Sequence, residues 1–149
     1  MEHNQLILSA KDVNIQFNLR GKVLHAIRGI DLDLYQGEVL AIVGESGSGK
    51  SVFTKTFTGM LESNGSITNG SVMFEGKDLT KLKTDKDWEG IRGAKISTIF
   101  QDPMTSLNPT YTIGNQLREA ILLHTDRNRE QANARAVEML KLVGVNEPE

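Results

Sequence analysis

The amino-acid sequence predicts an α/β fold, and three observations support this prediction. Two segments with the character of β-strands come first, an apolar run then leads into a glycine-rich loop and a helical pattern, and helical patterns dominate the last third. The 149 residues are enough for one domain with a hydrophobic core. We therefore expect an α/β core with an antiparallel β-region at the N-terminus and a helical region after the core.

The N-terminal β-region is expected to be a hairpin. Residues 6–17 alternate in part and contain β-branched side chains, and residues 23–34 form a second strand-like segment after a turn at 20–22. In the second segment, apolar and acidic side chains fall on opposite faces: Ile30, Leu32 and Leu34 against Asp31 and Asp33. This alternation is typical of a half-buried antiparallel strand.

The central part predicts a strand, a loop and a helix in that order. Residues 39–43 are all apolar without alternation, as in a strand that is buried on both faces of a parallel sheet. Residues 50–61 carry a wide apolar stripe at helical spacing. The glycine-rich loop lies between these two segments.

The rest of the chain predicts shorter elements and then two long helices. We expect a loop over 63–70, a short strand over 71–74, a short helix over 85–91 and an apolar strand over 96–100. Helices are predicted over 112–124 and 127–143, and Gly144 is expected to cap the second helix.

The glycine-rich loop has the spacing of a phosphate-binding motif. It runs Gly44-Glu45-Ser46-Gly47-Ser48-Gly49-Lys50-Ser51, which matches G-x-x-x-x-G-K-[ST]. Glycines let the backbone turn tightly, so that its N–H groups and the following helix N-terminus face a polyphosphate. Lys50 can reach the β- and γ-phosphates, and the Ser51 hydroxyl can ligate Mg²⁺. A structural glycine turn is the alternative, but the position between a strand and a helix favours binding of ATP and Mg²⁺.

The composition argues against several other kinds of site. The chain has no cysteine, which removes disulfides, thiol catalysis and zinc–thiolate centres. Its formal net charge of −2 gives no sign of nucleic-acid binding. No apolar run approaches the roughly 18 residues that span a bilayer, and the N-terminus lacks the positive region of a signal peptide. We expect a cytosolic protein that reaches a membrane only through its partners.

A second motif points to one family. It runs Gln101-Asp102-Pro103-Met104-Thr105-Ser106-Leu107-Asn108-Pro109 and follows the apolar segment 96–100. Together with the phosphate loop it closely resembles the ATPase subunits of ABC transporters, in particular the oligopeptide/dipeptide (and nickel) importer group. Three shorter stretches agree with that group: Ala26-Ile27-Arg28-Gly29-Ile30, Gly37-Glu38 and Ile113-Gly114-Asn115-Gln116.

The resemblance covers essentially the whole chain and implies a fold. It implies a P-loop NTPase core of the ABC ATPase type, with the β-region and core over about 1–100 and the Q-loop and the start of a helical subdomain over 101–149. The family's signature motif, its Walker B acid with the catalytic glutamate and its switch histidine do not occur in these residues. We therefore interpret the chain as the N-terminal part of a larger ATPase, and we do not expect it to hydrolyse ATP alone.

The resemblance also implies roles for two further residues. Gln101 matches the Q-loop glutamine, which contacts Mg²⁺ and the region of the attacking water and links the ATP site to the membrane subunit. A carboxamide suits both tasks. Phe17 matches the aromatic position that stacks on adenine, with a core phenylalanine as the competing interpretation. The expected site thus has Lys50 and Gln101 as catalytic residues, Ser51 and Gln101 as metal ligands, and nucleotide-binding residues at Phe17, 44–51 and Gln101.

The function implied by the resemblance is that of a transport motor. An ATP-binding subunit of this kind couples ATP binding and hydrolysis to the import of oligopeptides or dipeptides at the cytoplasmic face of the membrane. Its implied partners are membrane-spanning permease subunits, a second ABC ATPase subunit and, indirectly, an extracytoplasmic peptide-binding protein, with no nucleic acid. The alternatives are a truncated, non-catalytic nucleotide-binding module and a small P-loop kinase, against which the strands before the loop argue.

Overall fold

The computed structural model describes residues 5–102 and 106–148. It divides into two compact units, Met1–Ile96 and Ser97–Glu149, which are described separately. Residues 1–4, which carry part of the signal-peptide argument, and residues 103–105 of the second motif lie outside the described residues. Within the described residues, no helix is long and apolar enough to cross a membrane.

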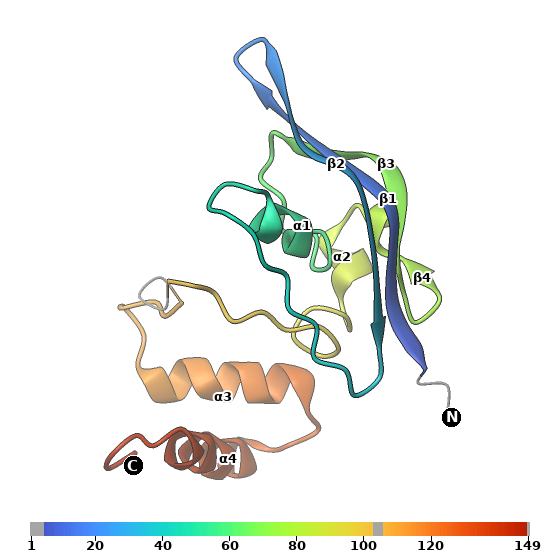
Figure 1. Cartoon of the computed structure of the whole chain (residues 1–149). Coiled ribbons are helices and arrows are strands. Elements are labelled where there is room, and N and C mark those ends of the chain that lie inside the picture. Colours follow the sequence, from blue (N-terminus) through green and yellow to red (C-terminus); the bar gives the residue numbers. More distant parts are fainter. Residues whose placement is uncertain (1–4, 103–105, 149) are drawn as a thin grey trace. The chain divides into compact units, whose positions relative to one another are not determined.

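An antiparallel sheet forms the framework of the first unit (Figure 1). β1 (Leu6–Leu19) lies between β2 (Lys22–Tyr35) and β3 (Gly65–Phe74), and the two-residue β4 (Lys77–Asp78) completes the order β2-β1-β3-β4. The predicted N-terminal hairpin is confirmed, and each strand extends slightly beyond its expected bounds.

β3 is longer than the sequence indicated. The predicted loop over 63–70 is wrong from Gly65 onward, because β1 pairs with this segment: Phe17 lies opposite Gly65 and Ile15 opposite Ile67. Backbone groups that β1 leaves unpaired on its second edge find their partners there. The hydrophobic pattern alone, which is interrupted by polar residues, does not reveal this pairing.

The core of the first unit packs against one face of the sheet. Alternate residues of β1 are buried, and Phe53 of α1 (Lys50–Lys55) is 2% exposed. The short segments η1 (Leu79–Lys81) and α2 (Asp85–Trp88) each add one buried side chain, and α2 begins with a capping box. The cluster comprises Leu8, Ala10, Val13, Ile15, Phe17, Ile27, Phe53, Val72, Phe74, Leu79, Trp88 and Ile91.

A bulge centred on Asp12 bends three strands together. Asp12 has a φ of 46°, and the register of β1 shifts there against both neighbouring strands. Its backbone N–H donates to Asp31 Oδ1 at 2.6 Å, and Asn69 Nδ2 donates to its Oδ2 at 2.5 Å. Gly70 has a φ of 90°, and a Cβ there would lie 2.3 Å from the Asp12 carbonyl oxygen. The bend therefore requires glycine on the facing strand.

The helix after the glycine-rich loop is shorter than predicted. α1 ends at Lys55, and hydrogen bonds between near neighbours carry the chain to Gly59, which has a φ of 63°. Met60 N–H donates to the Lys55 carbonyl at 3.0 Å and Gly59 N–H to the Thr56 carbonyl at 3.4 Å, the pattern of a Schellman cap. The predicted helix over 50–61 is thus stopped by a glycine in the left-handed region.

Two predicted strands are absent from the described structure. Residues 39–43 and 97–100 are not in strands, and Val39, Val43 and Ile99 are 97%, 87% and 100% exposed. A strand needs a neighbour that accepts and donates its backbone hydrogen bonds. Among the described residues no strand pairs with either segment, apart from an isolated bridge between Arg92 and Ile96. The predicted strand over 39–43, expected to be buried on both faces, and the predicted apolar strand over 96–100 are therefore both wrong.

The second unit contains the two predicted long helices. α3 (Ile113–His124) begins at the Thr112 cap, and α4 (Arg129–Leu142) begins at Asn128 with a capping box. The two helices contact each other, and Arg118 Nη1 donates to Asn133 Oδ1 at 2.9 Å. Gly144 follows α4 with a φ of 79°, which confirms the predicted C-terminal cap.

Candidate functional site: the phosphate loop

Residues 44–51 form a loop that turns directly into α1. Gly47 and Gly49 have φ values of 81° and 92°, in the left-handed region that favours glycine. Helical hydrogen bonding begins at once, because Phe53 N–H donates to the Gly49 carbonyl at 2.8 Å. No side chain caps the N-terminus of α1. Its first N–H groups are therefore available to an anion rather than to a capping oxygen.

Gly49 is required for a second reason, which is the close approach of β2. A Cβ on this residue would lie 2.5 Å from Ile27 Cδ1 and 3.2 Å from the Ala26 carbonyl oxygen. The buried Ile27 thus seats the end of the loop on the sheet. No local pattern in the sequence marks Ile27 for this role, because the contact depends on how β2 passes the loop.

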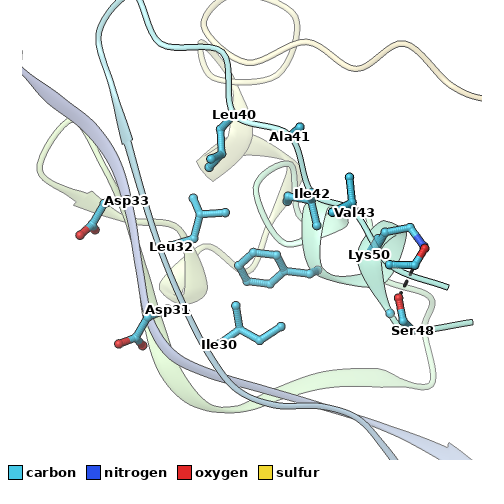
Figure 2. A pocket seen from close by; sticks show the side chains of 13 residues that line it. Ile30, Asp31, Leu32, Asp33, Leu40, Ala41, Ile42, Val43, Ser48 and Lys50 are labelled. Carbon is cyan, nitrogen blue, oxygen red and sulfur yellow. Dashed lines mark hydrogen bonds between the residues drawn. The ribbon is translucent and has the colours of Figure 1, made fainter.

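Lys50 closes the loop on itself. Its ammonium donates to the carbonyl oxygens of Gly44 at 2.8 Å and Glu45 at 2.7 Å, and it lies 3.5 Å from Ser48 Oγ (Figure 2). Ser48 N–H donates to the Glu45 carbonyl at 3.2 Å within the same turn. A positive charge is therefore held among backbone carbonyls where the motif predicts phosphate binding.

The remaining loop side chains face solvent. Glu45, Ser46, Ser48 and Ser51 are all exposed, and Ser51 lies in the first turn of α1 next to Lys50. A hydroxyl oxygen is the kind of ligand that Mg²⁺ accepts together with phosphate oxygens. Among the described residues no group of three or more His, Asp or Glu side chains is arranged to hold a metal. The role of Ser51 as a metal ligand stays a prediction.

An apolar pocket of about 650 Å³ lies beside the loop in the first unit. Ile30 and Leu32 of β2 face Leu40 and Ile42 across it (Figure 2), and Phe53 of α1 also lines it. The loop residues Gly44, Ser48, Gly49 and Lys50 line it as well. An apolar lining does not suit a polyphosphate, so the interior of this pocket does not fit the expected phosphate site.

The acidic residues of β2 have partners within the sheet. In Figure 2, Asp31 and Asp33 point away from the apolar side chains of the pocket. The ammonium of Lys11, at 2.9 Å, and the hydroxyl of Ser9, at 2.6 Å, hold the pKa of Asp33 below its ordinary value. Asp31 accepts the backbone N–H of Asp12. Both carboxylates therefore support the strand pairing.

Two further residues of the expected site, Phe17 and Gln101, are not part of the loop sequence 44–51. The Phe17 ring is 9% exposed and packs on Gly65, where a Cβ would lie 2.6 Å from Phe17 Cε1. This burial fits the core interpretation, and adenine stacking by Phe17 stays a prediction. Gln101 is exposed and belongs to the second unit. Its contact with Mg²⁺ also stays a prediction.

Comparison with known proteins identifies relatives along most of the chain. The oligopeptide transport ATP-binding protein AmiE of Streptococcus pneumoniae is 56% identical over 144 residues, which are 97% of this chain and 41% of that protein. The dipeptide transport ATP-binding protein DppD of Bacillus subtilis is 47% identical over 95% of this chain and 42% of its own length. This chain spans about two fifths of the length of these curated relatives.

Solved structures and a family model complete the comparison. The dimeric structure of MJ0796, a bacterial ABC transporter cassette, matches with a TM-score of 0.80 at 23% identity, over 95% of this chain and 59% of that one. A structure of the same cassette in a post-hydrolysis state bound to ADP and Pi matches with a TM-score of 0.76 at 21% identity, over the same shares of the two chains. These likenesses confirm the expected cassette fold. Since the ABC transporter model also matches residues 27–149, this chain belongs to the ABC transporter family.

Proposed function

We propose that this chain carries the phosphate-binding part of the ATP-binding subunit of a peptide importer. The observation that carries the proposal is the Lys50 ammonium, which two loop carbonyls hold beside the glycines at 47 and 49. Membership of the ABC transporter family supports nucleotide binding, and the names of the peptide-transport relatives support the substrate class. Peptides are favoured over nickel on the same ground.

Phosphate binding follows from groups that this chain provides. Backbone N–H groups of the loop and of the first turn of α1 donate to the β- and γ-phosphates of ATP, and Lys50 moves from its carbonyl partners to phosphate oxygens. The Ser51 hydroxyl holds Mg²⁺, which neutralises part of the phosphate charge when bound. Gln101 is proposed as a second metal ligand that also orients the attacking water, and Phe17 as the residue that contacts adenine.

The proposal includes the transporter assembly to which this chain would belong. ATP hydrolysis coupled to peptide import requires a second ATPase subunit, identical or homologous, and membrane-spanning permease subunits. An extracytoplasmic peptide-binding protein would deliver the peptide, and the ATPase would sit at the cytoplasmic face of the membrane. We place the Q-loop and the start of the helical subdomain in residues 101–149, after the β-region and core over about 1–100.

The test is nucleotide binding by a Lys50→Ala variant. Wild-type protein should bind ATP in the presence of Mg²⁺ in isothermal titration calorimetry, and the variant should bind it roughly a hundredfold more weakly, because several charge-assisted hydrogen bonds are lost. Lys95→Ala is a matched control, since Lys95 pairs with Glu75 at 2.5 Å in the same unit and is not among the residues that line the pocket beside the loop. Equal ATP affinity of Lys50→Ala and wild type would refute the site.

A second measurement separates the motor from the non-catalytic module. Steady-state ATPase activity should depend on Lys50 wherever it is observed, because the same ammonium contacts the transferred phosphate. Sustained turnover by this chain that Lys50→Ala abolishes would reject the interpretation as a binding module without catalysis.

A further inference from the structure

The turn that follows α1 is held by the side chain of Arg92, which belongs to neither sequence motif. Arg92 Nε donates to the Thr58 carbonyl at 2.7 Å, and Arg92 Nη2 donates to the Gly59 carbonyl at 3.2 Å. These carbonyls belong to the Schellman turn that ends α1, where helix carbonyls lack partners within the helix. A single planar guanidinium thus caps two adjacent carbonyls.

Trp88 of α2 supports this contact from the side. A Cβ at Gly59 would lie 2.3 Å from Trp88 Cζ2, so the indole is packed directly on that glycine. Trp88 is 6% exposed, and the guanidinium carbon of Arg92 lies 4.8 Å from the centre of its ring. Asp85 Oδ1 lies 3.2 Å from Arg92 Nη1, but its side chain is fully exposed and holds Arg92 only weakly.

The opposite end of α1 is the phosphate loop. There Gly49 is seated against Ile27, and between the two ends Phe53 and Thr56 are each 2% exposed. α1 ends at Lys55, and the hydrogen-bonded turn over 56–60 continues directly from it, so the segment from Gly49 to Met60 is one short hydrogen-bonded unit. Loss of the hydrogen bonds from Arg92 to Thr58 and Gly59 would therefore shift the position of Lys50 and of the N–H groups that are proposed to bind phosphate.

We propose that Arg92, supported by Trp88, is a positioning residue for the phosphate loop. Its hydrogen bonds reach none of residues 44–51, all of which the structure describes, and it acts by fixing the turn after the helix that carries Lys50 and Ser51. This role rests on the proposed function of the loop in binding ATP. The side chain was missed in the sequence because its partners are backbone carbonyls more than 30 residues earlier.

The test compares Arg92→Met with Arg92→Lys. Met keeps much of the apolar stem but removes every donor, and Lys keeps the charge but loses the planar fork. We expect Arg92→Met to weaken ATP binding about tenfold in the presence of Mg²⁺ and Arg92→Lys to restore part of that loss, since small misplacements at a site have large effects. Two controls should bind within about twofold of wild type: Lys95→Met, which removes a nearby charge, and Val72→Ala, which lowers stability in the core of β3.

Trp88 supplies a second readout, because it is the single tryptophan of the chain. Addition of ATP and Mg²⁺ to wild type should change the intrinsic tryptophan fluorescence, since Trp88 packs on the far end of the helix that binds phosphate. The change should be lost in Lys50→Ala and reduced in Arg92→Met, but retained in Val72→Ala. A purely structural role of Arg92 would instead give Arg92→Met the same behaviour as Val72→Ala.

The results of these measurements distinguish the role of Arg92 from the proposed ATP binding. Wild type that binds ATP, together with a folded Arg92→Met variant of equal affinity and equal fluorescence response, would overturn the role of Arg92 alone. If Arg92→Met does not fold, Arg92→Lys decides, and wild-type affinity with an unchanged response would overturn the role. Wild-type protein that does not bind ATP would overturn the proposed function and, with it, the role of Arg92.

Discussion

β1 and the segment 39–43 are both rich in apolar side chains, but their surroundings differ completely. β1 pairs with β2 on one edge and β3 on the other, and Val13 and Ile15 are 0% and 1% exposed. In the segment 39–43, Val39 and Val43 remain almost fully exposed. Apolar composition favours burial, but a strand also requires neighbours that satisfy its backbone. The difference therefore arises from hydrogen-bond partners and not from the side chains.

Hydrogen exchange should show the largest difference between the two regions. Amides of β1 are expected to exchange only through global unfolding, whereas amides of 39–43 should exchange at nearly the rate of an unfolded peptide. Exchange followed by mass spectrometry on peptides covering 6–19 and 38–44 measures this. Equal protection of both peptides would break the comparison, because it would mean that 39–43 is paired in solution.

Truncation of one apolar side chain in each region is the next test. Ile15→Ala should lower the free energy of unfolding by about 2–5 kcal/mol, because a side chain that packs on all sides is lost. Val39→Ala should change it by less than about 0.5 kcal/mol, since Val39 is 97% exposed. Urea denaturation of the two variants gives both values. A cost for Val39→Ala similar to that of Ile15→Ala would show that Val39 is buried.

α2 is an intermediate case, since side-chain hydrogen bonds hold a segment that has no strand partner. Backbone N–H groups of Thr84, at 2.8 Å, and Lys83, at 2.9 Å, donate to the Asp87 carboxylate and lower its pKa below the ordinary 3.8. The resulting stabilisation is fully present above pH 3.8 and is lost as pH falls through the lower pKa of the folded state.

Asp87→Asn should therefore lower the stability much less than Ile15→Ala does, and its effect should depend on pH. The variant is expected to be slightly less stable than wild type at neutral pH, and its stability should fall less steeply than that of wild type as the solution is acidified below pH 3.8. Thermal unfolding followed by circular dichroism over this range measures both slopes. Parallel slopes would show that Asp87 does not contribute through its charge.

Much of the fold can be predicted from local patterns. Alternation predicts the β1–β2 hairpin, the cap residues Thr112 and Gly144 lie where α3 begins and α4 ends, and the glycine spacing predicts the turn into α1. These signals are local, so neighbouring residues suffice to satisfy them. The pairing of residues 65–69 with β1, in contrast, depends on partners about 50 residues earlier in the chain, such as Ile15 opposite Ile67.

The candidate site also has a part that the sequence predicts and a part that it does not. Residues 44–51 can be predicted because all of their chemistry lies in consecutive positions. The contacts that fix the loop were not found: Ile27 against Gly49 at one end of α1, and Arg92 with Trp88 against Gly59 at the other. Their side chains are ordinary residues of a strand and a short helix, and only the tertiary arrangement gives them a role.

The bulge at Asp12 has a consequence for how this sequence can vary. Asp12, Gly29 and Gly70 lie on three different strands, and a Cβ at either glycine would meet an atom of Asp12 within 3 Å. Positions 12 and 70 therefore differ in the substitutions that they tolerate. Asp12→Gly fits the backbone at φ 46°, whereas Gly70→Asp does not fit. A library of single substitutions, scored for folded protein, should accept glycine at 12 and reject every side chain at 70. Position 70 is therefore limited to glycine, because a Cβ there meets the Asp12 backbone, whereas a Cβ at Gly29 meets only the Asp12 side chain.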